Sequence, residues 1–365
     1  MKKNKFQTEY IGLELKIKEQ TGINRARVYI IVGLIIAIIK LGRVNLKKIA
    51  PLINPKRSNR TNYRRLNKFF EKFSFDKKVR AKLLGSFLPK EEKWILTMDR
   101  TNWKFGKSNI NFLVLGVAYK GMAIPLFWYL LDKRGNSNYS ERIVIIQDFI
   151  EEFGAEKIEV LVADREFVGK EWFKWLKEKN IPFVQRVMKN HQIKMGKGLV
   201  AVSSIFSHLA LGEHTIHSKK KTLYGYENLS IVAVKLKDEY LILATNLEPE
   251  NALGFYKRRW EIETLFSALK TRGFNLEETH MSNPQKLDTL FTILALAFVW
   301  SHSIGEWLND KEPIKTLKHG RKAKSIFLYG LEYLARILLN SEYFSSELKF
   351  IFYLFHFKDL KIGDY

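Results

Sequence analysis

Apolar residues recur at helical spacing through the first 90 residues of the chain. Val28–Ile39 is an apolar run of 12 residues, and Gly42 follows it at a position where a helix would end. Asn45–Ile53 repeats the helical spacing, and Pro55 ends it. Because a membrane-spanning helix needs roughly 18–20 apolar residues, the long run predicts a core helix and no membrane span.

The next segment predicts a basic helix over residues 58–73, with Ser58 or Asn59 as its N-cap. Its apolar side chains fall on one side, and its cations lie mostly on the other: Arg60, Arg64, Arg65 and Lys68. A helix, a short turn and a basic helix form the outline of a helix-turn-helix that reads DNA. A solvated basic face on a bundle helix is the alternative.

From about residue 93 the pattern changes to that of strands. Trp94–Met98 and Glu159–Ala163 are predicted buried strands, and Lys120-Gly121 is predicted to join strands 110–119 and 122–131 in a tight hairpin. Helices are expected over residues 139–153 and 167–179, and a further strand over 181–187. Strands mixed with helices indicate an α/β region with a mixed sheet.

The remaining chain is strand-like first and helical afterwards. Residues 188–248 are polar with strand-like patches, and one long helix is expected from about 249 to 272. Trp260 within it and Trp128 are predicted to be buried. Further helices are expected over residues 287–308, 323–339 and 343–357, where the apolar run Leu290–Trp300 again indicates a core helix.

The charge of the chain indicates a class of binding partner. The chain holds 62 Lys and Arg against 38 Asp and Glu, a net charge of +24. Residues 1–90 alone hold 15 Lys and 8 Arg against 5 acids, so the excess is concentrated there. A polyanion is the expected partner, nucleic acid before anionic membrane. Cysteine is absent, which excludes disulfides, thiolate-bound zinc and thiol catalysis, and a cytoplasmic location is expected.

Two predicted buried strands run directly into aspartates, Asp99 and Asp164. Ligands of open α/β sheets bind beyond the carboxyl ends of the strands, so these two carboxylates are expected to face each other. Two carboxylates that face each other closely need a cation between them, or one of the two carboxyl groups must stay protonated. An oxygen-only ligand set favours Mg²⁺ or Mn²⁺. A turn residue or a helix N-cap is the alternative for each aspartate alone.

The predicted helix over 249–272 carries a polar stripe beside its apolar face. At about 100° per residue, Tyr256, Arg259, Glu263 and Lys270 fall within roughly 60° of one another. Glu261 points roughly 200° away from Glu263 and is predicted to be solvated. Surface ion pairing of Arg259 with Glu263 is the alternative, but it explains neither the tyrosine nor the distant lysine.

These residues resemble the Y-R-E-K signature of DDE-type transposases of bacterial insertion sequences, in the family numbered four. Leu96-Thr-Met-Asp99 and Val162-Ala-Asp-Arg-Glu-Phe167 are similar to the blocks around the two aspartates of that family. The intervals are 65 residues from Asp99 to Asp164 and 99 from there to Glu263. In that family a β-rich subdomain lies in the second interval. The resemblance covers about residues 94–280 and, more loosely, the basic N-terminal region.

The resemblance implies a ribonuclease-H-like α/β core in which Asp99, Asp164 and Glu263 are catalytic and hold two Mg²⁺ ions, for which Mn²⁺ can substitute. Two such ions activate the attacking oxygen and stabilise the leaving one. The implied activity is cut-and-paste DNA transposition: cleavage at terminal inverted repeats, then strand transfer into target DNA, with excision through a hairpin. The implied DNA contacts are Tyr256, Arg259 and Lys270, and Phe206, Tyr224 or Tyr226 would stack on an unpaired base. Arg165 directly follows Asp164 and is a further candidate for a phosphate contact.

Five parts are expected along the chain. They are an all-α basic DNA-binding domain (1–90), the first part of the core (91–187), a β-rich insertion (188–248), the second part of the core (249–310) and a helical C-terminal region (311–365). The last is a candidate for dimerisation, since two element ends imply a homodimer on double-stranded DNA. No organic cofactor is expected. The alternatives are a metal-dependent nuclease of the same fold and a catalytically silent, transposase-derived DNA-binding inhibitor.

Overall fold

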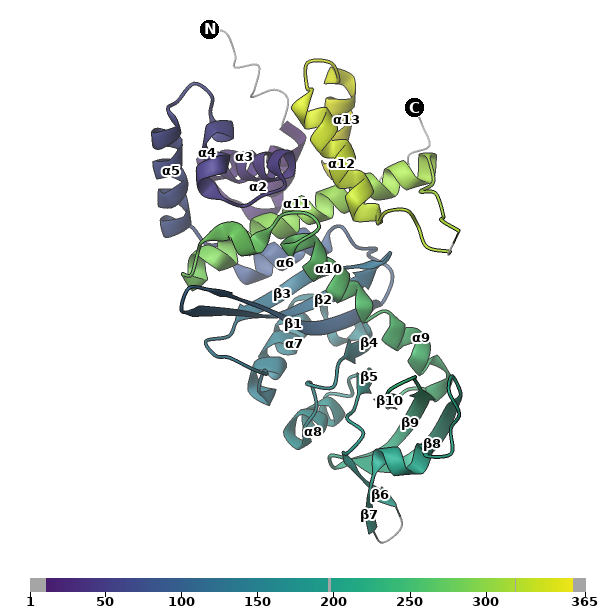
Figure 1. Cartoon of the computed structure of the whole chain (residues 1–365). Coiled ribbons are helices and arrows are strands. Elements are labelled where there is room, and N and C mark those ends of the chain that lie inside the picture. Colours follow the sequence, from purple (N-terminus) through teal and green to yellow (C-terminus); the bar gives the residue numbers. More distant parts are fainter. Residues whose placement is uncertain (1–10, 196–197, 319, 357–365) are drawn as a thin grey trace. The chain divides into compact units, whose positions relative to one another are not determined.

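The computed structural model describes residues 11–195, 198–318 and 320–356, and its contacts divide the chain into two compact units (Figure 1). The sheet unit comprises residues 90–102 and 111–264. The helical unit comprises the chain up to residue 89, residues 103–110 and the chain from residue 265. The expected five-part division remains a prediction, and the expected end of the last helix at residue 357 lies outside the described residues.

The sheet unit is built on a mixed sheet. Its strands are β1 Trp94–Phe105, β2 Ser108–Tyr119, β3 Met122–Leu130, β4 Ile158–Ala163, β5 Phe183–Arg186, β6 Gln192–Met195, β7 Gly198–Ala201, β8 His214–Leu223, β9 Tyr226–Lys235 and β10 Tyr240–Thr245. The order is β3-β2-β1-β4-β5-β10-β9-β8-β6-β7 (Figure 1). β1, β4 and β5 run parallel, whereas β2–β3 and the pairs from β5 to β9 are antiparallel. The predicted mixed sheet flanked by helices is confirmed.

The predicted hairpin between β2 and β3 is also confirmed. Lys120 and Gly121 both have positive φ, 47° and 90°, the conformation that two-residue hairpin turns require. β1 differs from its prediction. It does not end at Met98 but continues to Phe105, so Asp99 lies inside a strand and not just after it.

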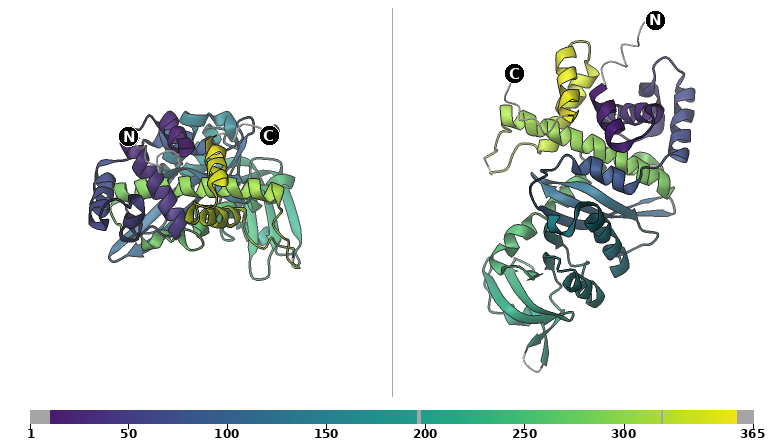
Figure 2. Two further views of the ribbon diagram at one scale, coloured as in Figure 1. Left: turned by 90° about the horizontal axis from the view of Figure 1, so that it is seen from above. Right: turned by 180° about the vertical axis from the view of Figure 1, so that it is seen from behind.

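Alternating side chains give the parallel strands two different faces. Val160, Val162 and Val184 share a buried cluster with Tyr256 of α9 (Ala252–Lys257). On the other face Phe183 contacts Phe173 of α8 (Lys170–Glu178), and Trp94 contacts Phe149 and Phe153 of α7 (Tyr139–Phe153). The view from behind in Figure 2 shows α7 and α8 on that second face. Residues of one parity therefore point toward α9, and those of the other parity point toward α7 and α8.

The helix expected over 249–272 is broken. It consists of a 3₁₀ turn Pro249–Asn251, α9 and α10 (Trp260–Lys270). Around residues 258–262, backbone N–H groups bond the carbonyl three residues earlier, and this winds the chain by about 120° per residue instead of 100°. Trp260, predicted to be buried, is consequently 59% exposed, whereas Trp128 is buried as predicted.

The helical unit joins segments from both ends of the sequence. Its helices are α2 Ile11–Thr21, α3 Arg25–Leu41, α4 Leu46–Ile53, α5 Asn59–Lys72, α6 Lys77–Gly85, α11 Pro284–Lys311, α12 Ile326–Leu339 and α13 Ser345–His356. Gly42 ends α3 in the left-handed conformation, and Ser58 caps α5, as predicted. The apolar α3 packs against α11 and α12 (Figure 2), so its burial depends on helices more than 240 residues away.

Within the described part of the chain, one helix, α11, is long and apolar enough to cross a membrane, and α3 with α4 passes the same test as a bent pair. In α11, however, 89% of the apolar window is buried inside the structure. This burial is the expected property of a core helix, which is what the apolar run Leu290–Trp300 predicted.

Candidate active site

Three neighbouring parallel strands deliver polar side chains in one row. Met98 pairs with Ala163, and Ala163 pairs with Gln185. The next residues along the three strands are Asp99, Asp164 and Arg186. Their parity is that of Val160, Val162 and Val184, so the row continues the face covered by α9. Two carboxylates and a guanidinium thus follow directly on the apolar positions of one face.

Backbone and side-chain donors fix the two aspartates. The N–H groups of Arg100 and Arg165 donate to Oδ1 of Asp99 and Asp164, at 2.7 and 2.8 Å. The hydroxyl of Tyr256 donates to Oδ1 of Asp164 at 3.3 Å. Each carboxylate is therefore oriented by the chain around it, and one oxygen of each already has a bonded proton donor.

Arg259 lies between two of the predicted metal ligands. Its Nη1 is 3.5 Å from Oδ2 of Asp99, and its Nη2 is 2.7 Å from Oε1 of Glu263. Its side chain is only 5% exposed. The guanidinium bridges the carboxylate of the sheet and the carboxylate of α10, and in this arrangement it supplies the positive charge that two close carboxylates need.

A second arginine balances the other aspartate. Arg186 lies 3.9 Å from Oδ1 of Asp164, and its Nη2 pairs with Glu239 at 2.7 Å. Sequence reasoning missed both residues. The alternation along β5 could have found Arg186, because it occupies the same face as Val184 at the end of the strand. Glu239 has no such signal, since it lies in the turn between β9 and β10.

Burial and like charge shift the acidity of this cluster. Removal from water raises the pKa of Asp99 to about 7, assisted by the nearby carboxylates of Glu166 and Asp164 and opposed by the Arg100 N–H and Arg259. Burial, together with Asp164, raises the pKa of Tyr256 to about 12. Tyr256 is therefore a hydrogen-bond donor at neutral pH, and Asp99 is the carboxyl whose ionisation most needs a cation.

The donor chemistry of the cluster fits a hard divalent cation, but its present arrangement does not. Asp99, Asp164 and Glu263 offer only oxygen ligands, as Mg²⁺ prefers. Within the part of the chain that the structure describes, no three His, Asp or Glu side chains are grouped so that they could share one ion. Since Arg259 bridges Asp99 and Glu263, its guanidinium must move before those two carboxylates can share a metal.

The face opposite to the aspartates carries a network that the sequence did not indicate. Arg100 pairs with Glu166 at 2.6 Å and donates to Asn111, Asn136 and the Gly135 carbonyl at 2.6–3.1 Å. These bonds tie β1 to the turn after Asp164 and to the segment before α7. Arg100 therefore ties the strand that carries Asp99 to the turn that carries Asp164, from the opposite face.

The predicted DNA-contacting residues are placed as follows. Arg165 is about half exposed and lies 3.9 Å from Glu239. Lys270, in the helical unit, pairs with Glu277 at 2.8 Å and lies over the ring of Trp103. On α5, Arg60, Arg64 and Lys68 are exposed and Arg65 is half-buried. The contacts within the sheet unit bring Tyr256, Arg259 and Glu263 to the aspartates, whereas Lys270 and the α5 residues belong to the helical unit.

Glu261 was predicted to be solvated, and this is wrong. It is 7% exposed and bonds Arg258, whose Nη2 also donates to the Ala118 carbonyl at 2.9 Å. Backbone N–H groups of Tyr119 and Gly121 also bond it. The tight winding at residues 258–262 turns Glu261 toward the β2–β3 hairpin, so it fastens the start of α10 to the sheet.

Two isosteric substitutions two residues apart are therefore expected to have opposite effects. Glu261→Gln weakens a buried charged network and should lower the free energy of unfolding by about 1–3 kcal/mol, while the folded fraction still cleaves DNA. Glu263→Gln, at a half-exposed position, should leave thermal unfolding nearly unchanged and abolish cleavage. Differential scanning calorimetry and a cleavage assay at 20 °C below the melting temperature separate the two effects. An inactive but stable Glu261→Gln would transfer the catalytic role to Glu261.

Comparison with known proteins bears on the function of this cluster. The sequence matches the family described as the transposase DDE domain over residues 85–300, more than half of the chain. No curated protein matches it. Among solved structures, it is similar to the piggyBac transposase in a synaptic complex with hairpin DNA, with 12% identity and a TM-score of 0.47. That match covers 95% of this chain and 83% of the other, but its TM-score is too low to establish a shared fold.

The matched range includes every residue of the cluster formed by Asp99, Asp164, Tyr256, Arg259 and Glu263. A pair of partly buried aspartates with a nearby glutamate suits the metal-dependent phosphoryl transfer of such a domain. The chain belongs to the DDE transposase family, and it is a DNA transposase.

Proposed function

We propose that the chain carries out cut-and-paste transposition of a bacterial insertion sequence, with Asp99, Asp164 and Glu263 as the catalytic carboxylates of a ribonuclease-H-like core. The observation that carries the proposal is the row of Asp99 and Asp164 on adjacent parallel strands, with Glu263 joined to it through Arg259. This arrangement gathers acids from sequence positions 99, 164 and 263. Folding stability does not require such a cluster, because neighbouring carboxylates that are partly removed from water repel each other.

Two Mg²⁺ ions, held by the three carboxylates, would supply Lewis acidity to the attacking and leaving oxygens. The protein's residues position the substrate. Arg259, once it leaves Asp99 and Glu263, offers a planar fork of donors to a phosphate. The Tyr256 hydroxyl, with its pKa raised to about 12, remains a donor to a phosphate oxygen, and Lys270 offers a point charge on the same polypeptide segment.

The reaction consists of successive displacements at phosphorus. A water oxygen attacks the phosphodiester at the element's end, a new P–O bond forms, and the 3′ oxygen leaves and takes up a proton. The freed 3′-OH then attacks the opposite strand, which gives a hairpin, and after resolution it attacks the target DNA. Each step breaks one P–O bond and forms another, so no covalent protein intermediate is needed.

The three aromatic residues considered for base stacking are packed into the sheet unit. Phe206 is fully buried, Tyr224 contacts His191 and Phe173, and Tyr226 contacts Phe183. The exposed indole of Trp260 is the better candidate, since it lies beside the Arg259 guanidinium at 5.1 Å next to the acidic cluster. We include Trp260 in the proposal as the ring on which an unpaired base stacks, which is a contact worth about 1–3 kcal/mol.

The proposal is tested on a labelled duplex that carries the inverted repeat flanking the gene, incubated with Mg²⁺, Mn²⁺, Ca²⁺ or EDTA. Nicking at the repeat boundary followed by joining to a second duplex is expected in Mg²⁺ and Mn²⁺ and is absent in EDTA. Cleavage without joining would indicate the nuclease alternative. Binding without cleavage in every metal would indicate the DNA-binding inhibitor. The expected homodimer on DNA is measured in the same mixtures by light scattering.

Arg259→Ala is expected to strengthen metal binding and weaken catalysis. Removing the guanidinium between Asp99 and Glu263 removes a competing cation, so Mn²⁺ should bind the DNA-free protein about tenfold more tightly, which corresponds to about 1.4 kcal/mol. Cleavage should nevertheless fall, because the phosphate loses its arginine. Isothermal titration with Mn²⁺ measures the first effect without any turnover.

Arg165→Ala is the matched control, since Arg165 also follows the acidic row but lies against Glu239 and not between two ligands. Its Mn²⁺ affinity should equal that of the wild type. Unchanged or weaker Mn²⁺ binding by Arg259→Ala would contradict the bridging role of Arg259.

A further inference from the structure

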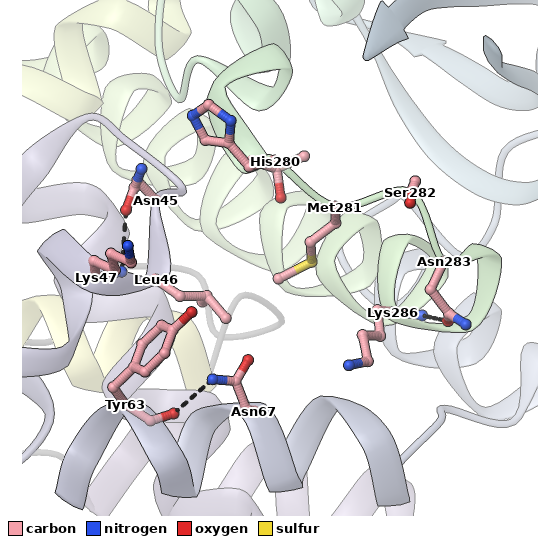
Figure 3. Close-up of a pocket in the computed structure, with 11 residues that line it drawn as sticks. Asn45, Leu46, Lys47, Tyr63, Asn67, His280, Met281, Ser282, Asn283 and Lys286 are labelled. Carbon is pink, nitrogen blue, oxygen red and sulfur yellow. Dashed lines mark hydrogen bonds between the residues drawn. The ribbon is translucent and has the colours of Figure 1, made fainter. Parts of the chain in front are cut away.

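A polar cavity of about 590 Å³ lies within the helical unit, apart from the acidic cluster (Figure 3). Three segments line it: the start of α4, one side of α5, and residues Thr279–Lys286 at the entry to α11. Figure 3 shows Tyr63 and Asn67 projecting from α5 toward the segment that contains Met281 and Lys286. Its volume is within the range of ligand sites, about 300–1,000 Å³, and is larger than a single small anion needs.

The lining contains cations and neutral polar groups and no carboxylate. Lys47 contributes from α4 and Lys286 from α11, with Tyr63 and Ser282 adding hydroxyls. Among the described residues, one acid pairs with either lysine: Glu71, which lies 3.3 Å from the Lys286 ammonium, is largely exposed and is not part of the lining. A cavity with two lysines and no acid favours an anionic ligand.

Two of the three amide side chains in the lining are oriented as donors, whereas Asn67 donates its own Nδ2 to the Tyr63 carbonyl at 3.2 Å. Oδ1 of Asn45 accepts from the Lys47 N–H, and Oδ1 of Asn283 accepts from the Lys286 N–H, each at 3.0 Å. Because these oxygens cap α4 and α11, their Nδ2 groups are the ends left for a ligand. Thr279, 5% exposed and part of the lining, has a buried hydroxyl for which the described residues supply no hydrogen-bond partner.

The cavity adjoins a row of cations on the same helix. Arg60, Arg64 and Lys68 follow one another at intervals of four residues on the exposed side of α5, so they form one row along it. Tyr63 and Asn67, also four residues apart, form the neighbouring row that faces the cavity. A ligand in the cavity therefore continues into a basic surface, as an extended polyanion would and a small anion would not.

We propose that this cavity holds a sugar-phosphate segment of DNA, with phosphates on Lys47 and Lys286 and the strand continuing along the basic row of α5. The inference rests on the proposed function in taking DNA as the polyanion. It assigns DNA binding to Thr279–Lys286, which follows the catalytic helix in sequence, and joins it with the N-terminal helices in one site. Phosphate contacts of this kind position DNA without reading its sequence.

The test is the salt dependence of binding to a fluorescent 40-base-pair duplex in EDTA, where no cleavage occurs. Each phosphate contact contributes about 0.9 to the slope of log K against log salt. Lys47→Ala and Lys286→Ala should each reduce the magnitude of the slope by about 0.9 and weaken binding about fivefold at 0.15 M salt, and the double variant should reduce it by about 1.8. Thermal unfolding of each variant checks that the fold is retained.

Lys48→Ala is the matched control, because Lys48 is the next residue of α4, is exposed and is not part of the lining. It carries the same charge change and should alter the slope by much less than 0.9. Equal slopes for Lys47→Ala, Lys48→Ala and the wild type would overturn the proposal. A second result would also overturn it: the wild type binds inorganic phosphate or ATP, the double variant does not, and the two proteins show the same salt slope for DNA. The cavity would then bind a free phosphate or nucleotide and not DNA.

The experiments distinguish failure of the proposal that the cavity binds DNA from failure of the catalytic proposal. Unchanged slopes with normal cleavage would reject the cavity and leave the transposase reaction intact. Reduced slopes in a protein that never cleaves DNA would support the cavity and reject the catalytic proposal.

Discussion

Asp99→Asn, Asp164→Asn and Glu263→Gln should each reduce DNA cleavage by at least about 10³-fold, which corresponds to about 4 kcal/mol of transition-state stabilisation. Each change removes one negative charge from the proposed ligand set and preserves the shape of the side chain. Asp99 should be the most sensitive position, because its side chain is the most buried of the three. Single-turnover cleavage of the repeat-bearing duplex measures the loss.

DNA binding should survive all three changes within about threefold, since the +24 net charge of the chain dominates it. Glu159→Gln is the matched control, because Glu159 is an exposed carboxylate on β4, the strand that leads to Asp164. It should cleave like the wild type. If any one of the three site variants cleaved normally, that residue would be removed from the proposed ligand set.

Gly330→Ala is expected to destabilise the helical unit strongly. A Cβ at Gly330 would lie 1.8 Å from the Ser301 carbonyl oxygen and 2.4 Å from the Gly305 nitrogen, where α12 crosses α11. Both neighbours are backbone atoms of a buried helix, so they cannot rotate away. Overpacking typically costs about 1–3 kcal/mol, and we expect at least the upper end, with a melting temperature lower by roughly 6–12 °C.

Gly305→Ala tests the same crossing from the other helix, since its Cβ would lie 1.9 Å from the Ile326 carbonyl oxygen. Gly254→Ala is the matched control, because Gly254 is an exposed helical glycine with no atom within 4 Å of its added Cβ. That substitution should stabilise the protein by up to about 1 kcal/mol. Near-native melting of Gly330→Ala would show that α11 and α12 do not pack this closely in solution.

The central residues of the site could be predicted because their signals are local. Apolar runs that end in Asp99 and Asp164 are visible in sequence, and the strand register then places the two aspartates side by side. The spacing of Tyr256, Arg259 and Glu263 was sufficient to put these residues on one side of the chain, although the helix that carries them is broken. A local pattern tolerates such a break, because the residues on its two sides still lie within two turns of one another.

The features that escaped prediction depend on contacts distant in sequence. Glu261 appeared solvated because a regular helix was assumed, whereas tight winding and the carbonyl of Ala118 in the β2–β3 hairpin hold it inside. Arg259 appeared only as a phosphate ligand, and its bridge between two carboxylates needs both the sheet and α10. The packing of α3 against α11 and α12 could not be predicted from the sequences of these helices, since an apolar helix pattern does not identify the helix it packs against.

The most direct test of the central claim is a crystal structure of the protein with its element-end DNA and Mn²⁺, using anomalous scattering to locate the metal. We expect anomalous peaks beside the carboxylates of Asp99, Asp164 and Glu263, with the Arg259 guanidinium displaced from them onto a DNA phosphate. Manganese bound elsewhere, or Arg259 still bridging Asp99 and Glu263 beside a loaded DNA end, would contradict it.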